Sequence, residues 1–297
     1  MKVGEVAVIG RPNSGKSTLV NRLIGEKIAI VSDKPQTTRK RILGVARLPG
    51  AEIALVDTPG IHRPEFRMNS AMVRDATDAL ASADLVLWVT DASEKSARGE
   101  SFILGLLERA KAKALLALNK VDLVPKEALL PRIAEAAARY QFQQIVPVSA
   151  LTGDGVERLG ELLAKHLPEG EPLYPEDFLT ATPESEWIAE VIREKLLERT
   201  REELPFASAV LVDSVKTKED QNLEVVTAHI VVEKESQKPI VIGRGGSMIR
   251  EIGKAARQEL EATQGRRYFL DLKVVVREKW RDDERFLSRL VSQPEDR

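Results

Sequence analysis

The sequence of 297 residues contains no cysteine. This absence excludes disulfide bonds, cysteine-ligated zinc and thiol chemistry, and it fits a reducing compartment such as the cytoplasm. Aromatic residues are scarce, at 4%, and no run approaches the ~18 consecutive apolar residues of a membrane span. The first residues also lack the apolar core of a signal peptide. We therefore expect a cytoplasmic protein, with any membrane contact peripheral and at the inner face of the cell membrane.

An excess of charge of either sign is also missing, because the net charge is only -1. Charged residues nevertheless make up 31% of the chain and hydrophobic residues 43%, which is typical of a globular protein. The length predicts two domains. Four prolines at positions 168, 172, 175 and 183 mark a linker between them. We predict a first domain over 1–168, a linker over 169–183 and a second domain over 184–297.

The most informative stretch is a phosphate loop of the pattern G-x-x-x-x-G-K-[ST], which follows an apolar strand and leads into a helix. Its glycines let successive backbone N–H groups and the helix N-terminus face phosphates. Lys16 is expected to reach the β- and γ-phosphates, and the Ser17 hydroxyl to ligate Mg²⁺. The predicted nucleotide-binding residues of this loop are Gly10, Asn13, Ser14, Gly15, Lys16, Ser17 and Thr18.

Further residues of a nucleotide switch follow at the ends of expected strands. The segment Asp57-Thr58-Pro59-Gly60 offers Asp57 to Mg²⁺, through water, and the Gly60 N–H to the γ-phosphate. Asn119-Lys120-Val121-Asp122 offers Asp122 to two guanine N–H groups that adenine does not present, Asn119 to N7 and the Lys120 stem to the ring face. Ser149-Ala150 would place the Ala150 N–H near guanine O6. The predicted ligands are therefore GTP and GDP with Mg²⁺.

The expected elements of the first domain alternate between strands and helices, apart from one antiparallel pair over 42–48 and 52–56. This pattern predicts an α/β fold with a mostly parallel sheet, whose ligand lies at the carboxyl ends of the strands. In the second domain we expect the order helix, strand, strand, helix, strand, with helices over 186–201 and 248–263 and strands over 208–215, 223–233 and 268–276. That order predicts a smaller α+β domain.

A second glycine motif lies in the second domain. Gly243-Arg244-Gly245-Gly246 has the G-x-x-G pattern and opens an expected helix, as in KH domains, where glycines let the backbone of single-stranded RNA approach closely. Residues 236–281 carry 11 Lys and Arg against 5 Asp and Glu, which favours an RNA-binding face. The predicted RNA contacts are Gly243, Arg244, Gly245, Gly246, Arg250 and Lys254.

Together, the phosphate loop, Gln36-Thr37-Thr38-Arg39, Asp57–Gly60, Asn119–Asp122, Ser149-Ala150 and the single RNA-binding domain resemble the Era family of bacterial ribosome-assembly GTPases across nearly the whole chain. The resemblance implies a P-loop GTPase domain joined to a type II KH domain, acting as a monomer on 16S ribosomal RNA near its 3′ end, in small (30S) subunit assembly, with no DNA partner. It also implies that Thr38 completes the Mg²⁺ shell, with adjacent Thr37 as the alternative, and that Asn13 matches a K⁺-binding position.

One residue departs from the small signalling GTPases. Ile61 stands where those enzymes carry the glutamine that orients the attacking water, so we expect slow hydrolysis by the isolated protein. Catalysis would rest on Lys16, Thr38 and Gly60, completed by K⁺ or a partner. Two other functions stay open at this point: an RNA-binding scaffold with a structural guanine nucleotide, and a GTPase at a membrane surface.

Overall fold

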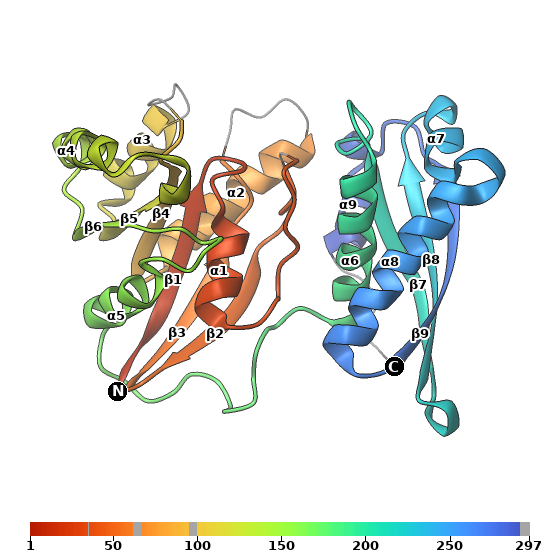
Figure 1. The fold of residues 1–297 in the computed structure, drawn as a ribbon, viewed down its shortest axis with the longest axis horizontal. Coiled ribbons are helices and arrows are strands. Elements are labelled where there is room, and N and C mark those ends of the chain that lie inside the picture. Colours follow the sequence, from red (N-terminus) through yellow and green to blue (C-terminus); the bar gives the residue numbers. More distant parts are fainter. Residues whose placement is uncertain (35, 62–66, 95–99, 292–297) are drawn as a thin grey trace. The chain divides into compact units, whose positions relative to one another are not determined.

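The computed structural model describes residues 1–34, 36–61, 67–94 and 100–291. The chain forms two compact units, one made mainly of residues 1–181 and the other mainly of residues 182 onward. Each unit has its own sheet (Figure 1).

The first unit contains, within the described residues, a six-stranded sheet in the order β2-β3-β1-β4-β5-β6. β2 runs antiparallel to β3, and all other neighbouring strands are parallel, which confirms the predicted α/β class. The strands are β1 (Lys2–Gly10), β2 (Ile42–Leu48), β3 (Ala51–Asp57), β4 (Leu85–Asp91), β5 (Ala114–Asn119) and β6 (Gln144–Pro147).

Helices cover both faces of this sheet (Figure 1). Leu19 of α1 and Leu159 of α5 pack in one buried core against β1 and β3. Ala76 of α2 and Ile103 of α3 pack in another, against Trp88 of β4. The helices are α1 (Lys16–Ile24), α2 (Arg67–Ser82), α3 (Glu100–Ala110), α4 (Leu129–Arg139) and α5 (Val156–His166), with short 3-10 turns at η1 (Val121–Leu123) and η2 (Lys126–Ala128).

The strand register determines where the polar motifs lie. Val8 of β1 pairs with Asp57 of β3, and Asp91 of β4 pairs with Asn119 of β5. The phosphate loop follows β1 directly after Gly10. These residues therefore meet at the carboxyl edge of the parallel strands, where ligands of such sheets bind.

Residues 169–181, part of the predicted linker over 169–183, pack against the sheet of the first unit, and the last of them bond to the edge strand β2. Val45 N donates to Leu179 O at 2.9 Å, and Thr180 Oγ1 donates to Leu43 O at 2.7 Å. The side chain of Glu52, 2% exposed, accepts the Leu173 and Tyr174 backbone N–H groups at 2.7 and 3.3 Å. Arg47 donates to the carbonyls of Pro175 and Phe178 and lies 3.5 Å from Glu52. These bonds therefore fix the segment to the sheet of the first unit.

The second unit has, in its described part, a three-stranded sheet in the order β7-β8-β9. β7 and β8 are antiparallel, whereas β8 and β9 are parallel. One face is covered by helices, through buried side chains such as Ile192 of α6 and Leu260 of α8. The elements are α6 (Glu184–Arg199), β7 (Ser208–Lys218), η3 (Glu219–Gln221), β8 (Leu223–Val232), η4 (Glu235–Gln237), α7 (Lys238–Ile242), η5 (Arg244–Gly246), α8 (Ser247–Gln264), β9 (Arg267–Val276), η6 (Trp280–Asp282) and α9 (Glu284–Val291).

One element differs from the sequence expectation. The apolar stretch Ile240-Val241-Ile242 lies in a separate helix, α7, which the predicted order lacked. Pro239 occupies the first turn of α7, where its missing N–H costs nothing, and Gly243 ends the helix with a φ of 73°. The observed order is therefore helix, strand, strand, helix, helix, strand, with the glycine motif between the two central helices. Among the described residues, no helix is long and apolar enough to cross a membrane.

We predict that Glu52→Ala destabilises the first unit by about 1–3 kcal/mol, since two backbone N–H groups lose their acceptor and Arg47 loses its counter-charge. Urea denaturation measures this change in the free energy of unfolding, and limited proteolysis reports cleavage within 169–181, which we expect to accelerate. Glu171→Ala, at an exposed position of the same segment, is the control. Equal stability of the two variants would contradict the role given to Glu52.

Candidate functional site

The phosphate loop has a backbone that only glycine permits at two positions. Gly10 has a φ of 157°, and a Cβ there would lie 2.3 Å from Val89 O. Gly15 has a φ of 91°, and a Cβ there would lie 2.2 Å from Asn119 Nδ2. Helix α1 starts at Lys16 without a side-chain cap, so its first N–H groups are available to an anion. The loop therefore has the form that the sequence motif predicts.

Two buried charges lie beneath this loop. Lys16 is 5% exposed and donates from Nζ to the carbonyls of Arg11 and Gly10, at 3.0 and 3.3 Å. Burial lowers the pKa of Lys16 to about 8, although the Asp57 carboxylate works to raise it. Burial likewise raises the pKa of Asp57, although Lys16, Ser17 and Thr38 work to lower it. Because each charge is taken from water, both would be stabilised by further charged ligands.

Three oxygen-bearing side chains gather beside Lys16. Ser17 Oγ donates to Asp57 Oδ2 at 2.6 Å and lies 2.8 Å from Thr38 Oγ1. Thr38 Oγ1 is 3.4 Å from the same carboxylate oxygen. Asp57 Oδ1 is buried and has no hydrogen-bond partner among the described residues. Hydroxyl and carboxylate oxygens with one unused acceptor are the ligands that Mg²⁺ prefers, so this cluster fits the predicted cation.

The geometry distinguishes the two adjacent threonines. Thr38 is 7% exposed and faces Ser17 and Asp57, as described above. Thr37 Oγ1 instead donates to Lys34 O at 2.6 Å, within its own loop. Asn13, with a φ of 61°, donates from Nδ2 to Asp33 O at 2.7 Å. The structure therefore places Thr38, and not Thr37, beside Ser17 and Asp57. The Mg²⁺ contact of Thr38 and the K⁺ contact of Asn13 stay predictions.

The loop after β3 approaches the phosphate loop closely. A Cβ at Gly60 would lie 2.7 Å from Pro12 N, and Ile61 N donates to Gly10 O at 3.0 Å. The Ile61 side chain is 1% exposed and belongs to the apolar core with Ala76 and Trp88. It is therefore turned away from the phosphate loop. His62 and the residues up to Phe66 lie outside the described residues.

Asn119 joins three loops through its carboxamide. Nδ2 donates to Ser14 O in the phosphate loop, and Oδ1 accepts the Ala150 N–H, both at 2.9 Å. Arg22 of α1 donates to Ala150 O at 3.3 Å and to Leu151 O at 2.5 Å. Sequence reasoning missed Arg22, because no local motif signals a contact across 128 residues. The predicted contacts of Asn119 with guanine N7 and of Ala150 N–H with O6 stay predictions.

The other two residues of the base motif lie beside Asn119. Lys120 has a left-handed backbone, with a φ of 63°, and its Nζ is 2.6 Å from Asp91 Oδ2. Burial works to raise the pKa of Asp91, but hydrogen bonds from Lys120 and Ser93 outweigh it and hold that pKa below its usual value. Asp122 lies in η1 with an exposed side chain. Its carboxylate is thus accessible to a base.

A cavity of about 310 Å³ lies beside the phosphate loop. It is lined by the phosphate loop, the segment before β2, Gly60 and Lys120. About half of the predicted nucleotide residues therefore line this cavity directly, whereas Asp57, Asn119 and Asp122 do not. Among the described residues it is lined by Pro12, Asn13, Gly15, Lys16, Ser17, Thr18, Ile30, Val31, Ser32, Asp33, Gln36, Thr37, Thr38, Gly60 and Lys120.

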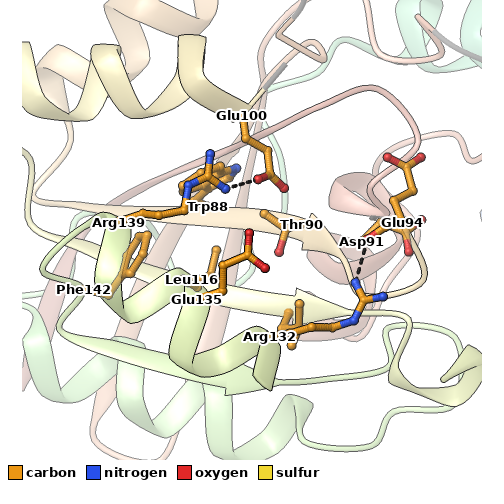
Figure 2. A pocket seen from close by; sticks show the side chains of 12 residues that line it. Trp88, Thr90, Asp91, Glu94, Glu100, Leu116, Arg132, Glu135, Arg139 and Phe142 are labelled. Atoms are coloured by element: carbon orange, nitrogen blue, oxygen red, sulfur yellow. Dashed lines mark hydrogen bonds and ion pairs between the residues drawn. The ribbon is translucent and has the colours of Figure 1, made fainter. Parts of the chain in front are cut away.

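A smaller pocket of about 50 Å³ lies on the opposite side of β4, between α3 and α4 (Figure 2). Figure 2 shows Arg139 paired with Glu100 and Arg132 reaching towards Glu94. The Arg132 Nη1 donates to Glu94 O at 2.6 Å. The volume of this pocket holds a few water molecules, and the charged side chains of Arg139 and Glu100 that line it are already paired with each other.

The glycine motif of the second unit forms a loop whose backbone favours glycine at three positions. Gly243, Gly245 and Gly246 have φ values of 73°, 59° and 77°. A Cβ at Gly243 would lie 2.7 Å from Met248, whereas one at Gly245 or Gly246 meets nothing within 4 Å. Arg244 is exposed, and Arg250 Nη2 donates to Gly245 O at 2.9 Å. The outer side of the loop is thus open to a close-lying backbone.

A groove of about 510 Å³ runs beside this loop, between α8 and the edge strand β9. Arg250, Lys254 and Arg257 border it from α8, and Phe269 borders it from β9 with 57% of its surface exposed. Sequence reasoning found the basic residues but missed Phe269, although an aromatic side chain in an alternating edge strand is a signal for base stacking. Positive charge and an exposed ring in one groove suit single-stranded RNA.

Comparisons with known proteins agree with this geometry. Residues 5–120 match a family described as "50S ribosome-binding GTPase", and residues 203–281 match a KH domain. GTPase Era of Geobacter metallireducens is 51% identical over 287 residues, covering 97% of this chain and 96% of that protein. GTPase Era of Geotalea uraniireducens is 50% identical over 284 residues, covering 96% and 95%.

Two solved structures match with a TM-score of 0.94 and 41% identity, each covering 97% of this chain and 98% of that chain. One is a variant of Aquifex aeolicus Era bound to GDP and AlF4⁻. The other is Era in complex with MgGDPNP and nucleotides 1506–1542 of 16S ribosomal RNA. The chain contains both the phosphate loop and the KH-type glycine loop, and it is 51% identical to a GTPase Era over nearly its whole length. It therefore belongs to the Era family of GTPases.

Proposed function

We propose that this chain is a GTP-hydrolysing switch that binds the 3′ region of 16S ribosomal RNA and assists assembly of the small (30S) ribosomal subunit in the cytoplasm. The observation that carries the proposal is the likeness, over 97% of the chain, to an Era solved with both MgGDPNP and a 16S ribosomal RNA segment. Two features support it. The buried Asp57, whose Oδ1 has no hydrogen-bond partner among the described residues, suits Mg²⁺, and the basic groove beside α8 suits RNA.

The residues around the phosphate loop supply charge neutralisation and positioning. Lys16 and the first N–H groups of α1 would contact the terminal phosphates. Mg²⁺, held by Ser17, Thr38 and Asp57, would neutralise further phosphate charge. Because the Ile61 side chain is buried in the core, it cannot orient the attacking water. We therefore propose slow hydrolysis by the isolated protein, completed by K⁺ or by a bound partner.

The first experiment measures affinity for RNA from the 3′ end of 16S ribosomal RNA, at fixed salt, with a GTP analogue, with GDP and without nucleotide. We expect the tightest binding with the GTP analogue, because GTP orders the loops around Thr38 and Gly60. By linkage, RNA would then favour the GTP state equally. RNA of the same composition in scrambled order is the control. Equal affinity in all three states would refute coupling, and equal affinity for both RNAs would refute the RNA assignment.

Base specificity is tested at Asp122. We expect Asp122→Asn to weaken GTP binding by roughly 100-fold, since a hydrogen bond to a charged group contributes about 1.5–3 kcal/mol and the carboxylate accepts two. The affinity for xanthosine triphosphate should rise in return, because the new amide can donate to the extra carbonyl of that base. Competition with a fluorescent guanine nucleotide measures both affinities. Glu127→Gln, exposed in nearby η2, should leave them unchanged. An unaltered GTP preference of the Asp122 variant would refute the assignment of Asp122 to guanine recognition.

The RNA groove is tested at Gly245 and Gly246, where a Cβ meets no neighbour. Replacing both by Asp places two negative charges where phosphates would lie, and we expect RNA affinity to fall by about tenfold or more. Replacing both by Asn is the matched control, since Asn tolerates the same backbone without charge. GTP hydrolysis without RNA should be equal in all three proteins. If the Asp variant binds RNA as tightly as the Asn variant, the groove is not the RNA site.

A further inference from the structure

The turn that ends β4 contacts both nucleotide loops. We call residues Asp91, Ala92, Ser93 and Glu94 the β4 turn; Figure 2 shows Asp91 and Glu94 within it, with Arg132 reaching towards it from α4. Ala92 N donates to Asn119 O at 2.7 Å, and Asp91 Oδ2 lies 2.6 Å from Lys120 Nζ. Glu94 Oε2 lies 2.5 Å from Arg11 Nη1 in the phosphate loop. One short segment is thus bonded to two loops that are more than 100 residues apart in the sequence.

The three contacts differ in strength. The Arg11 and Glu94 side chains are 36% and 52% exposed, so solvent screens their attraction. The Asp91 side chain is only 8% exposed, and that of Lys120 is 32% exposed. Screening is weaker for a partly buried pair, so of the two ion pairs the Asp91–Lys120 contact is the stronger restraint, and it acts on a side chain, whereas Ala92 N holds the backbone of the same loop.

The Asp91 carboxylate is itself held in place. Its Oδ1 accepts hydrogen bonds from Ser93 N at 2.8 Å and from Ser93 Oγ at 2.6 Å. These bonds leave Oδ2 directed to Lys120 Nζ. Lys120 in turn lines the nucleotide cavity. A flexible lysine with four rotatable bonds is therefore anchored at its far end, while its apolar stem stays available to a base.

We propose that Asp91 is a positioning residue for guanine-nucleotide binding: it holds the Lys120 side chain extended so that its stem covers one face of the base. The proposal rests on the proposed role of Lys120 at the base. Without the anchor, each binding event must immobilise the lysine chain, and affinity falls by the ordering cost of that chain. Among the described residues, the Asp91 side chain bonds to Lys120 and Ser93 and not to the residues expected at the phosphates, so we expect the rate of the chemical step not to depend on it.

The test is Asp91→Asn, which keeps the shape of the side chain and removes its charge. We expect the dissociation constant for GDP to rise about tenfold, mainly through faster release. The rate of GTP hydrolysis at saturating GTP should stay within about twofold, because Lys16, Ser17, Thr38 and Asp57 are untouched. Asp78→Asn, exposed on α2, is the matched control and should change neither quantity. An Asp91 variant with unchanged GDP affinity overturns the proposal.

A double-mutant cycle with Lys120→Met separates positioning from a general structural effect. If Asp91 acts through Lys120, Asp91→Asn does not weaken GDP binding further in a protein that already carries Lys120→Met. Additive losses, or an equal loss of thermal stability in both backgrounds, would show that the turn merely supports the fold and overturn the proposal. The affinity of the wild-type protein for GDP is also compared with its affinity for ADP. Absence of that preference refutes the proposed function itself, whereas a preserved preference with an ineffective Asp91 variant refutes only the positioning role.

Discussion

The first unit depends on two opposite charges buried under one loop. Lys16 and Asp57 are both less than a tenth exposed, and burial opposes the ionised form of each. They are tolerated because carbonyls, hydroxyls and their mutual attraction replace water. That replacement is incomplete, since Asp57 Oδ1 has no hydrogen-bond partner in the described part of the chain. A fold that leaves such a group unsatisfied gains stability when phosphate and a divalent cation bind, so ligand binding and local stability are linked.

Much of the nucleotide site could be predicted from the sequence, because its motifs are local. Gly10, Lys16 and Ser17 lie in one turn whose backbone is dictated by glycine, and strand register brings Asp57 to the same edge. The resemblance favoured Thr38 over Thr37, but spacing alone could not separate them, since adjacent residues differ only in which way the loop turns them. Asp91 and Arg22 were missed for another reason: their contacts join segments far apart in sequence, and no spacing rule covers them.

The second unit shows where short apolar runs become ambiguous. Ile240-Val241-Ile242 fits a buried strand as well as a helix by composition, and only the preceding Pro239 and following Gly243 favour the helix that forms. The residues at 169–181 show the opposite problem. Their prolines and acidic residues are typical of a free linker, yet backbone pairing with β2 and the buried Glu52 hold them in place. Edge-strand pairing leaves little trace in composition, because it uses main-chain groups.

The pairing of that segment with β2 shortens the length of unpaired chain that leads into the second unit. Ala181 N donates to Leu43 O of β2 at 3.4 Å, and α6 begins at Glu184. Three steps of the chain, spanning at most roughly 11 Å, join Ala181 to the first residue of α6. So short a connection makes any encounter between the two units an intramolecular event with a high effective concentration. Coupling between the two ligands therefore does not depend on diffusion at the end of a long tether.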